Sequence, residues 1–81
     1  MIINPNLEKL ILQRLKGEYP NPIYELKDVL PEHDPDEVCK HLFYFRDNGW
    51  VKFKEVRSRD GIGCITITIT KQGINHLETL A

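Results

Sequence analysis

The chain has 81 residues, a formal net charge of −1 and 41% hydrophobic residues. Its length suits one hydrophobic core, so we expect residues 1–81 to form a single domain. It contains no run of about 18 apolar residues and no signal-like segment, which predicts a cytoplasmic protein without a membrane span. Nucleic-acid-binding domains usually have a positive net charge, so this near-neutral value argues against binding to nucleic acid. The charge is uneven, however: residues 1–49 carry −3 and residues 50–81 carry +2.

The first helix is predicted to begin at Asn4-Pro5, because Asn suits an N-cap and Pro suits the first helical position. Gly17 is its expected end. Its core-facing residues recur at helical spacing and are Leu7, Leu10, Ile11 and Leu15. Leu12 is expected on the far side of this helix, as a candidate dimer contact.

Two further helices are predicted before residue 50. Asn21-Pro22 repeats the helix-start signal, and Pro31 ends a helix of roughly two turns. The apolar stripe of this helix comprises Ile23, Leu26, Val29 and Leu30. The next helix begins at Asp34-Pro35 with acidic residues in its first turn, which suit the helix dipole. Its core stripe comprises Val38, Leu42 and Phe45, and it ends at Asn48-Gly49.

Beyond Gly49 the hydrophobic period changes from helical to two, which predicts strands. Residues 50–57 and 64–70 are expected to form a β-hairpin around the turn at residues 58–63, which contains Asp-Gly. Strict alternation in the second strand would place Ile65, Ile67 and Ile69 on one face and Cys64, Thr66, Thr68 and Thr70 on the other. Thr70 then caps a short last helix, Lys71–Leu80, another candidate dimer contact.

Together these elements predict an α+β winged helix: a three-helix bundle with a two-stranded β-hairpin wing and a short C-terminal helix. Residues 38–51, Val-Cys-Lys-His-Leu-Phe-Tyr-Phe-Arg-Asp-Asn-Gly-Trp-Val, resemble the recognition-helix segment of small bacterial regulators of the MarR, PadR and ArsR kinds. Residues 69–73, Ile-Thr-Lys-Gln-Gly, resemble the exit of their wing. The resemblance implies a winged helix-turn-helix domain that binds double-stranded DNA.

In such a domain the third helix enters the major groove and the wing lies along the DNA backbone. The residues expected to contact DNA are Lys40, His41 and Tyr44 on the helix, and Lys52, Lys54, Arg57 and Arg59 on the wing. The hairpin cations could instead form a solvated, charge-protected strand edge. So small a module would need a homodimer or a partner for useful affinity.

The acidic start of the third helix favours an alternative. Asp36 and Glu37 would face the DNA backbone, unless they serve only as capping residues. A winged helix that binds a protein, and not DNA, explains both acids and the near-neutral charge.

Other classes of function find less support. Cys39 and His41 are two residues apart on a helix and point in different directions, so we expect no metal site. Cys39 and Cys64 are interpreted as small, buried or half-buried apolar groups. Trp50 is expected to pack at the corner between the third helix and the wing, which argues against a nucleobase-stacking platform. Catalytic motifs are absent from the sequence, so we expect no enzymatic activity and no cofactor.

Overall fold

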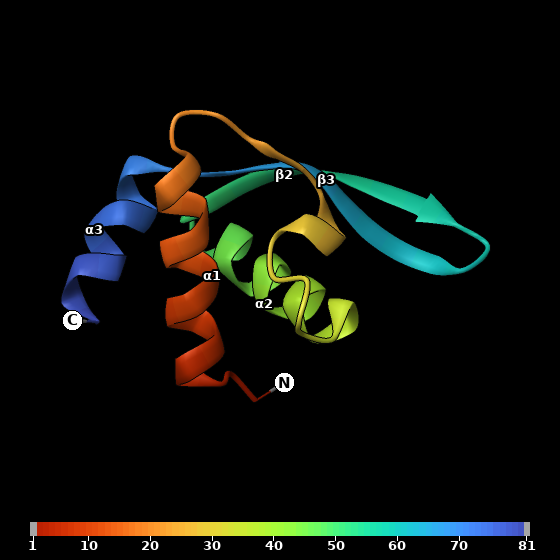
Figure 1. Ribbon diagram of the computed structural model, residues 1–81, viewed down its shortest axis with the longest axis horizontal. Helices are drawn as coiled ribbons and strands as arrows, with labels where there is room; N and C mark the ends of the chain where they lie inside the picture. Colours follow the sequence, from red (N-terminus) through yellow and green to blue (C-terminus); the bar gives the residue numbers. More distant parts are fainter. Residues whose placement is uncertain (1, 81) are drawn as a thin grey trace.

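In a computed structural model, residues 2–80 form an α+β arrangement of three α-helices and one three-stranded antiparallel sheet. The elements are α1 (Pro5–Glu18), β1 (Ile23–Glu25), the 3₁₀ turn η1 (Leu26–Asp28), α2 (Pro35–Asp47), β2 (Val51–Ser58), β3 (Gly61–Ile69) and α3 (Lys71–Thr79). The sheet lies across one side of α1 and α2, and the β2–β3 hairpin extends past α2 (Figure 1). None of the helices in this part of the chain is long and apolar enough to cross a membrane.

Helix α1 begins where the sequence predicts, because Asn4 Oδ1 accepts hydrogen bonds from the backbone N–H groups of the next turn. Its buried face differs from the prediction. Leu12 is fully buried, whereas Leu10 is 42% exposed, so the expectation of Leu12 as a dimer contact is wrong. The cause is α3, which covers a second flank of α1. Leu12 lies one turn after Glu8, whose carboxylate is 3.7 Å from His76 of α3.

The segment predicted as a second α-helix is a strand followed by a 3₁₀ turn. Ile23 and Glu25 of β1 pair with Ile67 and Ile65 of β3, and the strand order is β1-β3-β2. The predicted two-stranded hairpin is therefore part of a three-stranded sheet. A segment of eight residues between Pro22 and Pro31 is too short to be stable as an α-helix on its own, and β3 offers it backbone hydrogen bonds.

Helix α2 has the predicted bounds. Asp34 caps it by accepting from the N–H of Asp36 at 3.0 Å, and the predicted stripe of Val38, Leu42 and Phe45 is buried. The hairpin that follows turns at Arg59 and Asp60, since Ser58 and Gly61 are already paired.

A β-bulge breaks the predicted alternation of β3. Lys52 pairs with Thr68 but Lys54 pairs with Ile65, so two residues of β3 face one residue of β2. Thr66 takes a left-handed conformation with φ of 54°. The extra residue reverses which strand face the residues before it occupy. Cys64 consequently shares the core face with Ile67 instead of facing away from it.

Helix α3 is held tightly against the beginning of β2. The Thr70 hydroxyl accepts from the N–H of Gly73 at 3.0 Å and donates to the Gly49 carbonyl at 2.7 Å. The N–H of Thr70 also donates to the Trp50 carbonyl at 2.9 Å. A Cβ added at Gly73 would collide with that same Trp50 oxygen, so the close approach of α3 requires a glycine there.

Candidate nucleic-acid interface

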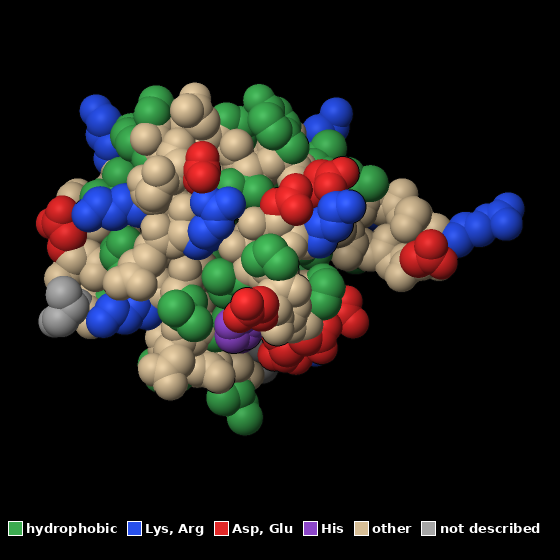
Figure 2. Space-filling view, viewed as in Figure 1, with side chains coloured by type: hydrophobic (Ala, Val, Ile, Leu, Met, Phe, Trp, Pro, Cys, Tyr) green, Lys and Arg blue, Asp and Glu red, His purple; other side chains and the backbone are tan. Residues whose placement is uncertain are grey.

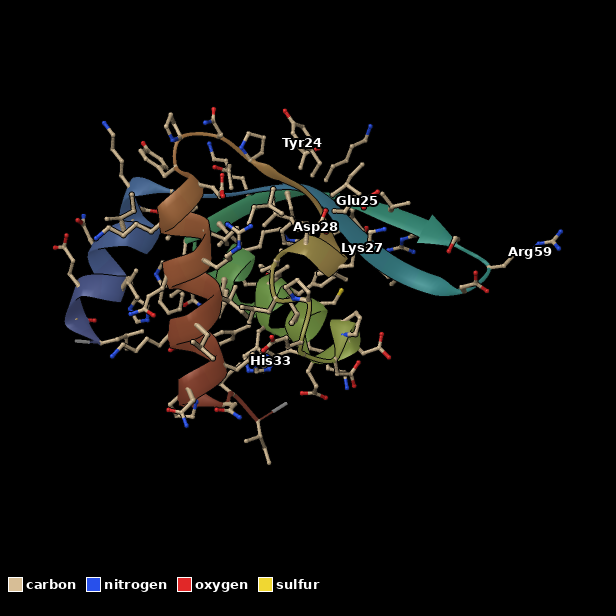
Figure 3. The ribbon with its side chains drawn as sticks, in the orientation of Figure 1. Tyr24, Glu25, Lys27, Asp28, His33 and Arg59 are labelled. Atoms are coloured by element: carbon tan, nitrogen blue, oxygen red, sulfur yellow. The ribbon has the colours of Figure 1, made fainter. Side chains whose placement is uncertain are left out.

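The predicted DNA contacts lie on two elements, α2 and the β2–β3 hairpin. Lys40 and Tyr44 are on the outward side of α2, and both are exposed. The side chains of Lys52, Lys54 and Arg57 are exposed along β2. Arg59 lies in the turn at the hairpin tip and points away from the body of the protein (Figure 3).

His41 does not belong to this surface, because its side chain is buried. The ring Nδ1–H donates to the Glu37 carbonyl at 2.7 Å, and Nε2 accepts from the N–H of Asn4 at 3.1 Å. Both ring nitrogens are therefore occupied in linking α2 to the first turn of α1. We remove His41 from the predicted DNA contacts for this reason.

The beginning of α2 is acidic. Glu32, Asp34, Asp36 and Glu37 are all exposed there. Figure 2 shows acidic side chains gathered around a histidine at the lower centre of the view, where Figure 3 labels His33. The ammonium group of Lys40 is 3.7 Å from the Glu37 carboxylate, which offsets its charge. This end of the helix therefore repels a polyanion more than it attracts one.

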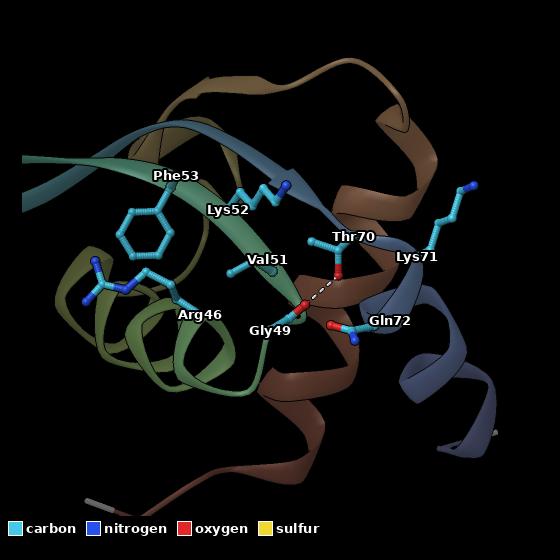
Figure 4. A pocket seen from close by; sticks show the side chains of 8 residues that line it. All are labelled: Arg46, Gly49, Val51, Lys52, Phe53, Thr70, Lys71 and Gln72. Carbon is cyan, nitrogen blue, oxygen red and sulfur yellow. Dashed lines mark hydrogen bonds between the residues drawn. The ribbon is translucent and has the colours of Figure 1, made fainter.

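Three cations surround a surface pocket of about 520 Å³ at the other end of α2. Arg46, Lys52 and Lys71 line it, together with Gly49, Val51, Phe53, Thr70 and Gln72. Figure 4 shows Arg46 beside Phe53 on one side and Gln72 on the other, while Lys71 extends outward. The lining contains no carboxylate, so the pocket is basic.

Arg46 was not among the predicted DNA contacts, which on the third helix were Lys40, His41 and Tyr44. The guanidinium lies 4.6 Å from the ring centre of Phe43 and 5.0 Å from that of Phe53. These rings hold the cation on the flank of α2 that faces the hairpin. The sequence did contain a signal for Arg46, because it directly follows Phe45 of the predicted core stripe. A residue next to a core residue lies on the flank of the apolar face of a helix.

The hairpin cations differ in how far they are neutralised. Arg57 is 3.4 Å from the Glu55 carboxylate. In the described part of the chain, Lys52, Lys54 and Arg59 form no ion pair, and neither do the pocket cations Arg46 and Lys71. These five residues are defined here as the basic surface. They are free to contact phosphate groups.

Trp50 lies at the predicted corner and is not available for nucleobase stacking. Its ring stacks on the imidazole of His76 with 3.5 Å between ring centres. It also contacts Tyr44 and Phe45 of α2 at ring-centre distances of 5.9 Å. Residues 2–80 contain no group of three metal-ligating side chains placed to hold an ion.

Comparison of the chain with protein-family models, curated proteins and solved structures found no match.

Proposed function

We propose that this protein is a winged helix-turn-helix domain that binds double-stranded DNA and regulates transcription. In this proposal, the outward side of α2 lies in the major groove and the β2–β3 hairpin is the wing. The position of the hairpin supports the proposal: it follows α2 directly and extends past it, as Figure 1 shows. The segment that resembles known regulators, residues 38–51, covers most of α2 and the first residue of this hairpin.

The observation that carries the proposal is the basic surface. Five cations without ion pairs lie in three places: at the pocket beside α2, on β2 and at the hairpin tip. Lys and Arg on such a surface neutralise phosphates and release condensed counterions, which makes binding depend strongly on salt. Contacts of this type position the protein on DNA but carry little sequence information.

The acidic beginning of α2 shapes the proposed mode of binding. Asp36 and Glu37 disfavour deep insertion of this end of the helix between phosphate backbones. We therefore assign most of the affinity to the basic surface, and base contacts to Lys40 and Tyr44. A homodimer or a partner protein would add the further DNA contacts that a domain of this size lacks.

Titration into random-sequence duplex DNA at several salt concentrations tests the proposal. We expect binding at about 50 mM salt that weakens steeply as salt increases. The Lys54→Ala/Arg59→Ala variant should weaken binding at least several-fold and reduce the slope of log K against log salt by about 2.

The matched control is Lys9→Ala/Lys16→Ala on α1, which makes the same change in net charge at exposed residues far from the hairpin in sequence. We expect this control to bind nearly as well as the wild type. Absence of binding by the folded protein at about 50 mM salt would refute DNA binding by this domain. Equal losses in both variants would refute the assignment of the contacts to the hairpin.

The acidic end of α2 favours one second candidate, a winged helix that binds a protein. Four exposed carboxylates within six residues, Glu32–Glu37, complement a basic surface on a partner. This candidate predicts no DNA binding, together with binding to a basic peptide that is lost in Asp36→Asn/Glu37→Gln.

A further inference from the structure

Two cysteines that are 25 positions apart in the sequence meet in the core. The Sγ of Cys39 on α2 is 3.6 Å from the Sγ of Cys64 on β3. Both residues are buried, with 8% of Cys39 and 1% of Cys64 exposed. The sequence predicted two small, buried or half-buried apolar groups, and strict alternation placed Cys64 on the face of its strand away from Ile67. The bulge at Thr66 accounts for the meeting, since it returns Cys64 to the core face.

The distance between the two sulfur atoms is that of non-bonded contact. A disulfide bond is about 2.05 Å long, so the sulfur atoms must approach by about 1.5 Å. The two cysteines belong to different elements, so rotation about their side chains and a small shift of the hairpin can close this gap. We propose that Cys39 and Cys64 are a covalent modification site, at which exchange with a low-molecular-weight disulfide forms an intramolecular disulfide.

Cys39 is the residue that reacts first, because it is the more exposed of the two. Its thiol loses a proton to water, and the thiolate attacks one sulfur of the small disulfide. A mixed disulfide forms on Cys39 and one small thiolate leaves. Cys64 then loses its proton and attacks Cys39 Sγ, which forms the Cys39–Cys64 bond and releases the second small thiol. Two protein thiols are oxidised, and one small disulfide is reduced to two thiols.

The second step is the slow one at neutral pH. Burial raises the pKa of the Cys64 thiol, and this cause persists after Cys39 has formed the mixed disulfide; in the reduced protein the hydrogen bond to Cys39 raises the pKa further. Arg46 of α2 lowers this pKa and Glu55 of β2 raises it, both by smaller amounts. Cys64 thus stays protonated through the neutral range. The rate of the second step should rise roughly tenfold for each pH unit, because the fraction of thiolate rises in that proportion.

Formation of the bond has a structural consequence. It links the first half of α2 covalently to β3 near the middle of the hairpin, and it closes a loop that contains the rest of α2 and all of β2. These two elements carry the proposed DNA contacts, so the effect on DNA binding rests on the proposed function. The chemistry does not rest on it and is tested separately.

The test treats the full chain with oxidised glutathione at pH 7 and pH 9, followed by alkylation in denaturant and intact-mass measurement. We expect a glutathione adduct to accumulate at pH 7. At pH 9 this adduct should release glutathione and give a monomer with an internal disulfide, whose mass is that of the reduced chain without both thiol hydrogens. Peptide mapping should find the bond between Cys39 and Cys64. The oxidised monomer should melt higher by on the order of 10 °C, and reduction should reverse this shift.

The control variants isolate each thiol. Cys64→Ala should stop at the adduct on Cys39, and Cys39→Ser should remain unmodified under the same conditions. The wild-type masses decide the proposal even if a variant folds poorly. Two free thiols at pH 9, an adduct that persists there, or bonds only between chains would overturn it.

Discussion

Substitution of Gly73 by alanine should destabilise the protein, although alanine favours helices. In the interior of a helix, alanine is about 1 kcal/mol more favourable than glycine. At Gly73, however, the new Cβ would collide with the Trp50 carbonyl oxygen and lie 2.7 Å from Cγ1 of Ile69. The oxygen cannot retreat freely, because it accepts the N–H of Thr70 at 2.9 Å.

The expected magnitude follows from these contacts. Extra atoms in a packed site cost about 1–3 kcal/mol, and loss of the Thr70 hydrogen bond costs about 1 kcal/mol. After the helix preference is subtracted, Gly73→Ala should lower the free energy of unfolding by about 1–3 kcal/mol. For a domain of this size, that corresponds to a decrease in Tm on the order of 10 °C.

Thermal unfolding followed by circular dichroism measures this change, with Gly17→Ala as the matched control. Gly17 is also helical, but a Cβ there meets nothing within 4 Å. The control should therefore raise stability by about 0.5–1 kcal/mol. A Gly73→Ala protein that melts at or above the wild-type temperature would refute the close approach of α3 to Trp50.

Two other substitutions test features that the sequence pattern did not predict. Thr66→Gly should raise the free energy of unfolding by up to about 1 kcal/mol, because glycine removes the cost of a β-branched residue in the left-handed conformation. Urea unfolding measures this change, and unchanged or lower stability would argue against the bulge. His41→Leu should lower the free energy of unfolding by about 1–3 kcal/mol, because the N–H of Asn4 loses its acceptor and the carbonyl of Glu37 loses its side-chain donor. Hydrogen exchange should then accelerate at the Asn4 amide, and an unchanged rate would contradict the contact.

Local signals predicted α1, α2, the hairpin and α3, since each has a capping residue or an alternating pattern of its own. The segment from Ile23 to Leu30 has such signals too, yet its structure depends on a distant partner. Its apolar spacing fits a helix, but β3 supplies the backbone hydrogen bonds that a short helix between prolines would lack. Short segments of this kind take the structure that their neighbours stabilise.

The candidate site was predicted only in part, for the same reason. The hairpin cations could be found from the strand pattern alone, because alternate residues of an exposed strand point to solvent. The sequence could not exclude His41 as a DNA contact. Only the fold, in which α1 crosses α2, shows that the N–H of Asn4 donates a hydrogen bond to its ring. Cys64 was assigned to the wrong face because threonine at position 66 gives no sign of a left-handed bulge residue.

Trp50 joins α2, β2 and α3, and it is the single tryptophan of the chain. Its fluorescence therefore comes from one place, where the imidazole of His76 covers one face of the indole. Detachment of α3 would uncover that face and change the emission while the sheet stays intact. The native sequence thus contains its own optical probe for the docking of its last helix, separate from the global unfolding that circular dichroism records.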